Sequence, residues 1–356
     1  MNFIKETVSV WDILARTDKP IFIYGMGDGA EKILRVFEEY RIPTAGFFAS
    51  DEFVRGHSFK DHLVHKLSDI EAQVEDFIVI LAFGAGYASL YDKVHDIAKR
   101  HELYAPDVPV AGSGLFTYEY AMEHAEEIEK VYSLLADDLS RRTFEDIINF
   151  KISGKIEYLD DCTADDDEIN SLIHLSDTEH YCDLGAYNGD TAAEFLRLCG
   201  GKYSHITAVE PDKRNFRKLS ANVTGNNISL INAAAWDSDG ETEFSVQKSR
   251  GSSTADTASQ KRAEKAIVIP TMTVDTAAPD ATLIKLDVEG AERRAIRGAQ
   301  NTIKNGAQII CALYHRNEDI FDLPLLIHSL NPGLKLYIRH KMYIPAWETN
   351  LYGINN

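Results

Sequence analysis

The chain has 356 residues, of which 44% are hydrophobic, and a formal net charge of −19. That length and apolar content allow a sizeable core and favour two domains over one. A protein that grips a phosphate backbone needs a local excess of Lys and Arg, so the acidic balance argues against nucleic acid as a partner.

Short apolar strands alternate with helices in the first half. Strands are predicted at 21–24, 45–49, 77–83 and 102–104, and each of the first three runs into Gly or a small polar residue. Amphipathic helices are predicted between them, around 31–39 and 87–99. Strands that alternate with helices in this way indicate a parallel sheet.

A glycine-rich turn follows the first of these strands. Gly25-x-Gly27-x-x-Ala30 is a weak dinucleotide fingerprint, with Asp51 as its candidate acidic partner. The stretch 46–51, followed by Gly56 and the strand 77–83, also resembles the nucleotide-sugar-binding domain of some sugar acyltransferases. The alternative is a Rossmann-like domain without a ligand, which serves for dimerisation, as in a homodimer, or for docking of an acceptor.

Between the halves, residues 116–150 are predicted to form one continuous charged helix. We therefore expect a Rossmann-like domain at 1–114, a helical connector at 115–155 and a second domain at 156–356. The acidic run 160–167 is interpreted as a solvated loop, since it lacks the Gly and the closing Glu of a calcium loop. The polar stretch 247–265 is predicted to be a flap near a substrate.

The second half repeats the alternation of strands and helices. Five strands are predicted, and two later runs are expected to pair as a closing antiparallel hairpin. The strands are at 180–184, 205–210, 228–232, 282–286 and 308–314, with the hairpin at 335–340 and 350–354. The fold class is therefore α/β, with two Rossmann-like doubly wound sheets joined by the connector.

The turn after the strand 180–184 carries the main motif. It reads Asp183-Leu-Gly185-Ala-Tyr187-Asn188-Gly189-Asp-Thr191 and enters a helix. Gly185 permits close approach of a ligand to the backbone, and Gly189 permits the turn into the helix. The free N–H groups of that helix suit a carboxylate. These features fit S-adenosylmethionine, whose ammonium Asp183 would bind directly or through water.

Glu210 ends the next strand, 25 residues after Gly185. A carboxylate there accepts hydrogen bonds from both ribose hydroxyls, as in dinucleotide-binding folds. The spacing Asp-x-Gly-x-x-x-Gly lacks the G-x-G-x-x-G that a pyrophosphate needs, which favours S-adenosylmethionine over NAD. Asp237 follows the third strand, where an adenine would rest, and the neighbouring Trp236 is interpreted as either an adenine contact or a core residue.

In this order, the motifs resemble those of the FkbM family of methyltransferases. The matching stretches are 183–191, Val209-Glu210-Pro211, 232–240, 269–275 and Ile284-Lys-Leu-Asp287-Val-Glu289-Gly290-Ala-Glu292. The resemblance covers 156–356 and implies a class I methyltransferase fold and O-methylation of hydroxyls, often on saccharides or polyketides. One position departs from it, because family members often carry Glu where this chain has Leu313.

Methyl transfer to a hydroxyl needs a base that removes its proton. Asp287, Glu289 and His315 are the candidates, because each follows the end of a predicted strand, where open α/β sheets bind ligands. His315 has the most suitable ordinary pKa. The alternatives are a hydrogen-bonded strand-end His, a helix cap for Asp287 and a solvated first turn for Glu289.

No spacing argues for a metal ion, although Asp287, His315 and His340 would be the ligands of one. His340 and Glu348 are predicted to lie on the surface of the hairpin rather than in an acceptor pocket. Two rival functions remain: a nicotinamide-dependent oxidoreductase that uses Gly25 to Asp51, and a non-catalytic nucleotide-sugar-binding module.

The expected partner is a small-molecule or glycan acceptor. No apolar run approaches the ~20 residues that span a bilayer, and residues 1–10 do not resemble a secretory signal. The four cysteines form no C-x-x-C pair and are predicted to be reduced. A cytoplasmic protein is therefore expected.

Overall fold

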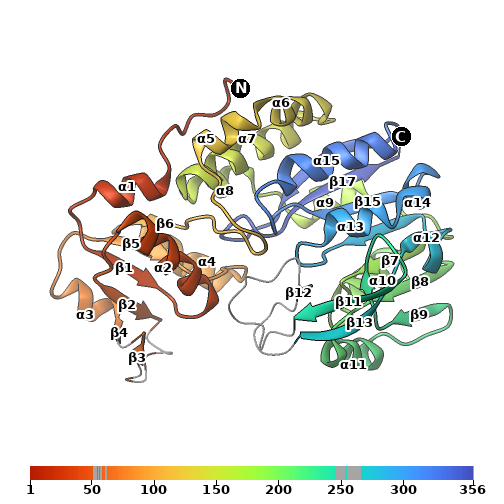
Figure 1. Cartoon of the computed structure of the whole chain (residues 1–356), viewed down its shortest axis with the longest axis horizontal. Coiled ribbons are helices and arrows are strands. Elements are labelled where there is room, and N and C mark those ends of the chain that lie inside the picture. Colours follow the sequence, from red (N-terminus) through yellow and green to blue (C-terminus); the bar gives the residue numbers. More distant parts are fainter. Residues whose placement is uncertain are drawn as a thin grey trace.

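The computed structural model describes residues 1–355 except 51–53, 55, 57, 61, 246–252 and 255–265. Its framework is two mainly parallel sheets, one in each half of the chain, with a group of helices above and between them (Figure 1). In the described part of the chain, no helix is both long and apolar enough to cross a bilayer.

The first sheet has six strands in the order β3-β4-β2-β1-β5-β6, and only β3 runs antiparallel to its neighbour. Four of them confirm the predicted strands, and β3 and β4 were not predicted. Strands β1 and β5, Ile-Phe-Ile-Tyr and Ile-Val-Ile-Leu, are buried throughout, as expected of parallel strands covered on both faces. The bounds are β1 Ile21–Tyr24, β2 Gly46–Ala49, β3 Ser58–Phe59, β4 His62–Lys66, β5 Ile78–Leu81 and β6 Glu102–Tyr104, with helices α1 Val10–Arg16, α2 Asp28–Tyr40, α3 Leu67–Glu71 and α4 Ala88–Ala98.

The connector is divided into several helices, so the prediction of one continuous helix at 116–150 is wrong. The helices of the connector are α5 Tyr118–Glu123, α6 Ala125–Leu134 and α7 Asp138–Ser153, and they are followed by α8 Glu157–Cys162 and α9 Asp166–Leu172. The break before α7 arises because Asp137 caps it, accepting a hydrogen bond from the Ser140 N–H. The acidic run 160–167 is not a loop either, because Asp165 caps α9 in the same way.

The second sheet has seven strands in the order β16-β17-β15-β14-β7-β8-β9. Strand β17 is antiparallel to both of its neighbours, which confirms the predicted hairpin and gives the class I methyltransferase arrangement. The bounds are β7 His180–Leu184, β8 His205–Val209, β9 Ile228–Ile231, β14 Leu283–Leu286, β15 Gln308–Ala312, β16 Lys335–His340 and β17 Thr349–Ile354. The helices are α10 Asp190–Leu198, α11 Lys213–Asn222, α12 Val274–Ala277, α13 Glu292–Arg297, α14 Gln300–Lys304 and α15 Asp319–Leu330.

A small third sheet was not predicted. It contains β10 Ala234–Ala235, β11 Gly240–Ser245, β12 Ser253–Thr254 and β13 Ala266–Met272 in the order β10-β13-β11-β12. Strand β13 carries Pro270 although it lies between two other strands, which is a position where Pro argues against a strand. The predicted flap at 247–265 lies almost entirely outside the described residues.

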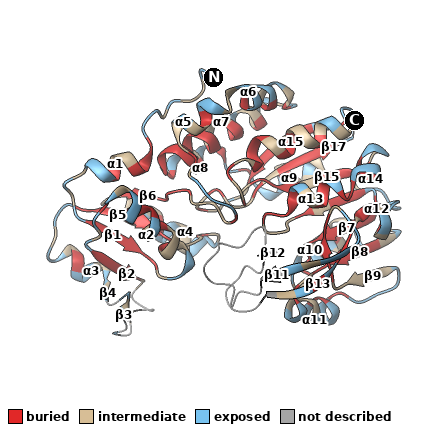
Figure 2. Cartoon of the chain, viewed as in Figure 1, coloured by how far each residue is buried: buried red, intermediate tan, exposed pale blue. Residues whose placement is uncertain are grey.

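One continuous apolar core joins the two halves through the connector. It includes Phe77 of the first half, Phe144 of α7 and Leu336 of β16. The central strands β1, β5 and β7 are buried along their whole length, as Figure 2 shows. The connector and the segment between α8 and α9 also cover the edge strand β16, because the N–H groups of Ala136 and Ala164 donate to the carbonyls of Leu336 and His340.

Candidate active site

A cavity of about 1180 Å³ lies at the carboxyl ends of the strands of the second sheet. Ligands of open α/β sheets bind at this edge. The predicted site residues that line the cavity are Gly185, Tyr187, Asn188, Thr191, Glu210, Asp287, Glu289 and His315. The structure thus brings together side chains that lie up to 130 positions apart in the sequence.

The turn between β7 and α10 depends on two glycines. At Gly185 (φ +81°), a Cβ atom would lie 1.9 Å from the carbonyl oxygen of Asp287. The residue therefore allows close approach of the neighbouring strand, whereas the sequence suggested close approach of a ligand. At Gly189 (φ +90°), a Cβ atom would lie 2.4 Å from the Val223 side chain.

Glu210 links this turn to the end of β8. Its Oε2 accepts a hydrogen bond from the Tyr187 N–H at 3.0 Å, and its Oε1 accepts one from the Asp212 N–H at 2.8 Å. Burial raises the pKa of the Glu210 carboxyl to about 7, although both hydrogen bonds oppose the rise. The carboxyl group faces the cavity with its position fixed by two loops.

Asp183 lies behind the turn and does not line the cavity. It is fully buried and accepts a hydrogen bond from the Thr191 hydroxyl, while its Oδ1 has no hydrogen-bond partner among the described residues. Burial raises the pKa of its carboxyl, against the attraction of Lys285. Lys285 lies beside Asp183 in the register of β7 and β14, and it lines the cavity.

Sequence reasoning missed Lys285 as a site residue. The available signal was a Lys inside the otherwise apolar strand Leu-Ile-Lys-Leu, since lysines are rarely buried without a purpose. Its Nζ lies 3.8 Å from the Asp287 carboxylate. It therefore supplies a positive charge in the cavity wall beside Asp287.

The end of the cavity that contains Asp287 and Glu289, called the reacting end below, is acidic, and its carboxylates surround one histidine. His315 Nε2 lies 3.5 Å from the Asp287 carboxylate and 3.8 Å from that of Glu289, and Nδ1 lies 2.9 Å from Glu292. The Tyr314 hydroxyl donates to both oxygens of Asp287 at 3.1 and 3.2 Å. Asp287 therefore does not cap a helix, and helix α13 begins after Ala291.

Comparison with known proteins agrees with this geometry. Residues 183–343 match the methyltransferase FkbM domain model. This part of the chain matches the FkbM methyltransferases. The match supports S-adenosylmethionine as the cofactor. No curated protein sequence matches the chain significantly.

The chain is similar in fold to the methyltransferase FkbM of Methylobacillus flagellatus KT. The TM-score is 0.71 at 20% identity, over 97% of this chain and 92% of that one. More distant similarities are to Aeropyrum pernix fibrillarin in complex with S-adenosyl-L-methionine (TM-score 0.32, 15% identity, 52% and 72% covered) and to a precorrin-6y C5,15-methyltransferase of Geobacter metallireducens GS-15 (0.34, 13%, 55% and 93%). The first similarity extends through the N-terminal half.

Asp237 of the FkbM domain does not reach the cavity. Its carboxylate pairs with Arg294 Nη1 at 2.9 Å, and the guanidinium of Arg294 lies 4.7 Å from the ring centre of Trp236. Trp236 is buried and does not line the cavity either, which favours its interpretation as a core residue. Ala234 and Ala235 line that part of the cavity instead.

The surroundings of His315 argue against its predicted role as the base. Burial by itself would lower the pKa of the imidazole, but the carboxylates of Glu292, Asp287 and Glu289 outweigh it and raise the pKa to about 10. A protonated imidazole cannot accept a proton at neutral pH. Burial raises the pKa of Glu289 to about 7, which suits a general base.

Asp287 is held in its charged form. Burial favours its neutral form, but Lys285 and His315 keep the pKa of its carboxyl below the ordinary value. Leu313, which occupies the position of a common family Glu, is packed in the apolar core. The acid next to the His315 Nδ1 is therefore Glu292, which also accepts hydrogen bonds from the N–H groups of Val288 and Gly290.

Three of these groups are close enough to bind a metal ion. Asp287, Glu292 and His315 offer ligand atoms within 4.8 Å of one another. His340 is not part of this group, because its ring nitrogens contact the Thr349 hydroxyl and the Tyr343 carbonyl. His340 is buried rather than on the hairpin surface, and Glu348 lines the cavity, so both differ from the prediction.

The candidate nucleotide site of the first half lies elsewhere. Gly25 and Gly27 do not line the cavity, and Asp51 is outside the described residues. The ring of Phe83 lies over Gly25, where a Cβ atom would be 2.5 Å from it. A pyrophosphate that approached Gly25 would meet this ring.

Proposed function

We propose that this protein is an S-adenosylmethionine-dependent O-methyltransferase that acts on a hydroxyl group of a saccharide or a sugar-containing metabolite. One observation carries the proposal: the Glu210 carboxyl is fixed by two backbone N–H groups and faces a cavity that also contains Glu289. The position of Glu210 supports a nucleoside cofactor, and the position of Glu289 supports proton removal from an acceptor.

The cofactor end of the cavity fits S-adenosylmethionine. Glu210 accepts hydrogen bonds from the ribose hydroxyls, and the first turn of α10 receives the carboxylate of the amino acid part. The buried Oδ1 of Asp183 lacks a partner in the described structure, as expected of an atom that receives the ammonium group through water.

The reaction needs alignment and one proton transfer. When bound, S-adenosylmethionine would supply the methyl group to the acceptor oxygen, with the thioether sulfur as the leaving group that keeps the bonding electrons. Glu289 takes the proton of the acceptor hydroxyl. Asp287, held by Tyr314 and Lys285, accepts a hydrogen bond that orients the acceptor, and protonated His315 keeps both carboxylates in place.

Two measurements test this function. Calorimetric titration with S-adenosylhomocysteine is expected to show binding that weakens about 10- to 100-fold in Glu210→Ala, because a charged hydrogen-bond acceptor is lost. Exposed Glu127→Gln is the control and retains the wild-type affinity. Labelled S-adenosylmethionine is then incubated with a panel of glycosides, and the products are expected to carry the labelled methyl group in place of a hydroxyl proton.

Equally tight binding by Glu210→Ala would overturn the cofactor assignment. Transfer of label to nitrogen or carbon acceptors, with none to hydroxyls, would overturn the acceptor assignment.

A further inference from the structure

The first half of the chain forms part of the wall of this cavity. Phe83, Gly84 and Tyr87, which follow β5, line it together with residues of the FkbM domain, and so does Val110. Backbone hydrogen bonds fix both segments: Ala85 exchanges a pair with Ile344, at 2.7 and 3.2 Å, and the Ala111 N–H donates to the His315 carbonyl at 2.8 Å. The first half therefore reaches the reacting end directly.

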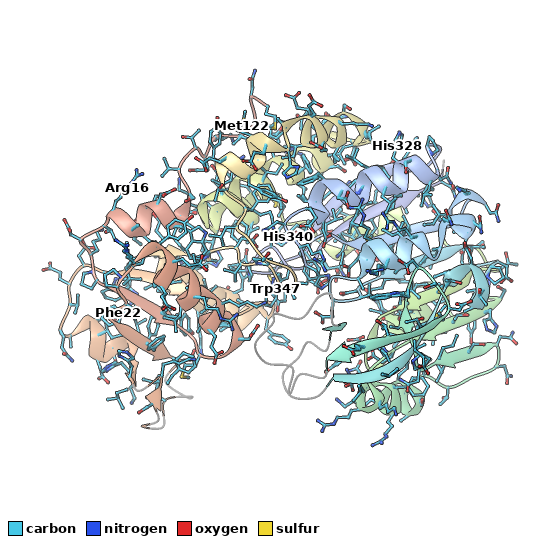
Figure 3. All side chains as sticks on the ribbon, viewed as in Figure 1. Arg16, Phe22, Met122, His328, His340 and Trp347 are labelled. Carbon is cyan, nitrogen blue, oxygen red and sulfur yellow. The ribbon has the colours of Figure 1, made fainter. Side chains whose placement is uncertain are left out.

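Two glycines of this wall are shaped around one aromatic ring. A Cβ atom at Gly84 would lie 2.3 Å from the Tyr343 hydroxyl oxygen, and one at Gly86 would lie 2.4 Å from the ring. The ring of Tyr343 in turn lies 5.8 Å from that of Trp347, between centroids. Trp347 is found between the two halves (Figure 3), and it lines the cavity beside Glu348.

The wall leaves one aromatic side chain uncovered. Tyr87 is 68% exposed, the highest value among the exposed large apolar side chains of the described residues. Phe83, Tyr87, Tyr343 and Trp347 thus present rings from both halves to the same cavity. Aromatic faces pack against the C–H face of a pyranose ring, and the nearby carboxyl groups of Glu289 and Glu348 accept hydrogen bonds from its hydroxyls.

The charge of the cavity restricts the acceptor further. Among the described lining residues, seven are Asp or Glu and four are Lys or Arg. At the reacting end, Lys285 lies near Asp287, and Lys341 lies 3.4 Å from Asp166 and 3.9 Å from Glu194. Even with His315 protonated, the carboxyl groups of Asp287, Glu289, Glu292 and Glu348 outnumber the cations of this end, so a phosphate or a uronic acid would meet an excess of acidic groups.

We propose that the acceptor subsite is shared between the halves, and that Phe83 and Tyr87, together with Tyr343 and Trp347, form an aromatic wall on which an uncharged saccharide stacks. The proposal rests on the proposed function for its acceptor class. It assigns the first half a role in acceptor recognition and excludes sugar phosphates and nucleotide sugars as acceptors.

Saturation-transfer NMR on the full chain tests this. The probes are the methyl glycosides of glucose, galactose, mannose and rhamnose, together with glucose 6-phosphate and UDP-glucose as charged counterparts. At least one neutral glycoside is expected to bind, and Tyr87→Ala is expected to raise its dissociation constant at least fivefold, about 1 kcal/mol. Met122→Ala, an exposed apolar residue of α5, is the matched control and leaves it unchanged.

A second variant separates stacking from loss of fold. Gly84→Ala displaces the Tyr343 ring and is expected to weaken the same glycoside, while calorimetric binding of S-adenosylhomocysteine stays at the wild-type level in both variants. Absence of glycoside binding, unchanged affinity in Tyr87→Ala, or tighter binding of UDP-glucose would overturn the proposal. Tyr87-dependent glycoside binding without any S-adenosylhomocysteine binding would sustain it and refute the proposed function instead.

Discussion

Replacement of Glu289 by Gln removes the group to which we assign the acceptor proton. Because general bases contribute about 10²- to 10⁴-fold, kcat is expected to fall by that factor. The pKa of about 7 gives the pH dependence in the wild type: roughly one tenth of Glu289 is charged at pH 6 and nine tenths at pH 8, so the rate should rise about tenfold over that range. The dependence is expected to be absent from the residual activity of Glu289→Gln.

The assay is initial-rate methyl transfer from labelled S-adenosylmethionine between pH 5.5 and 9, at saturating cofactor. Binding of S-adenosylhomocysteine to Glu289→Gln should match the wild type, because the residue lies at the reacting end. Glu127→Gln again serves as the control. A variant that keeps both its rate and the rise between pH 6 and 8 would refute the assignment, and His315→Gln, which removes the imidazolium, would then be the next variant to measure.

Three further predictions concern stability and shape. Gly185→Ala places a methyl group 1.9 Å from the Asp287 carbonyl oxygen, so both Tm and S-adenosylhomocysteine affinity should fall, and a normal variant would contradict the steric argument. Lys151→Met leaves its buried partner Asp107, 2.5 Å away, without a counter-charge, and should lower the free energy of unfolding in urea by about 3–5 kcal/mol, whereas adding Asp107→Leu should restore much of it. Burial lowers the pKa of His340 from 6.5 to about 4, so the unfolded chain takes up a proton first when the pH is lowered. The free energy of unfolding should therefore decrease as the pH is lowered from 6.5 to about 4, by up to about 1.4 kcal/mol per pH unit. His340→Gln should lose less over this range, and equal losses would refute the argument.

The sequence was sufficient to predict that Gly185 and Glu210 come together at one cavity, because both follow strand ends. Gly185 and Glu210 end neighbouring parallel strands, and the carboxyl ends of such strands meet at one edge of a sheet. The same rule places Asp287 and His315 beside them. Asp237 illustrates its limit, because that residue comes after a short strand of the unpredicted third sheet and turns toward Arg294.

Protonation at the reacting end could not be predicted in this way. The ordinary pKa of a lone imidazole made His315 the natural base, but three carboxylates of the segment 287–292, which packs against the end of β15, surround it. Their combined field reverses the expectation for His315, and for this reason we propose Glu289 as the base. A pKa depends on distances between groups, and the sequence does not contain those distances.

By itself, the sequence determined the alternation of strands and helices, the closing hairpin and the glycine turn before α10, since each depends on apolar periodicity or on local backbone geometry. Only the tertiary structure decided that Lys285 faces the cavity, that the helical connector is broken, and that Phe83 and Tyr87 of the first half lie beside Trp347. Those outcomes depend on packing between segments that are hundreds of positions apart, and no local pattern records such contacts.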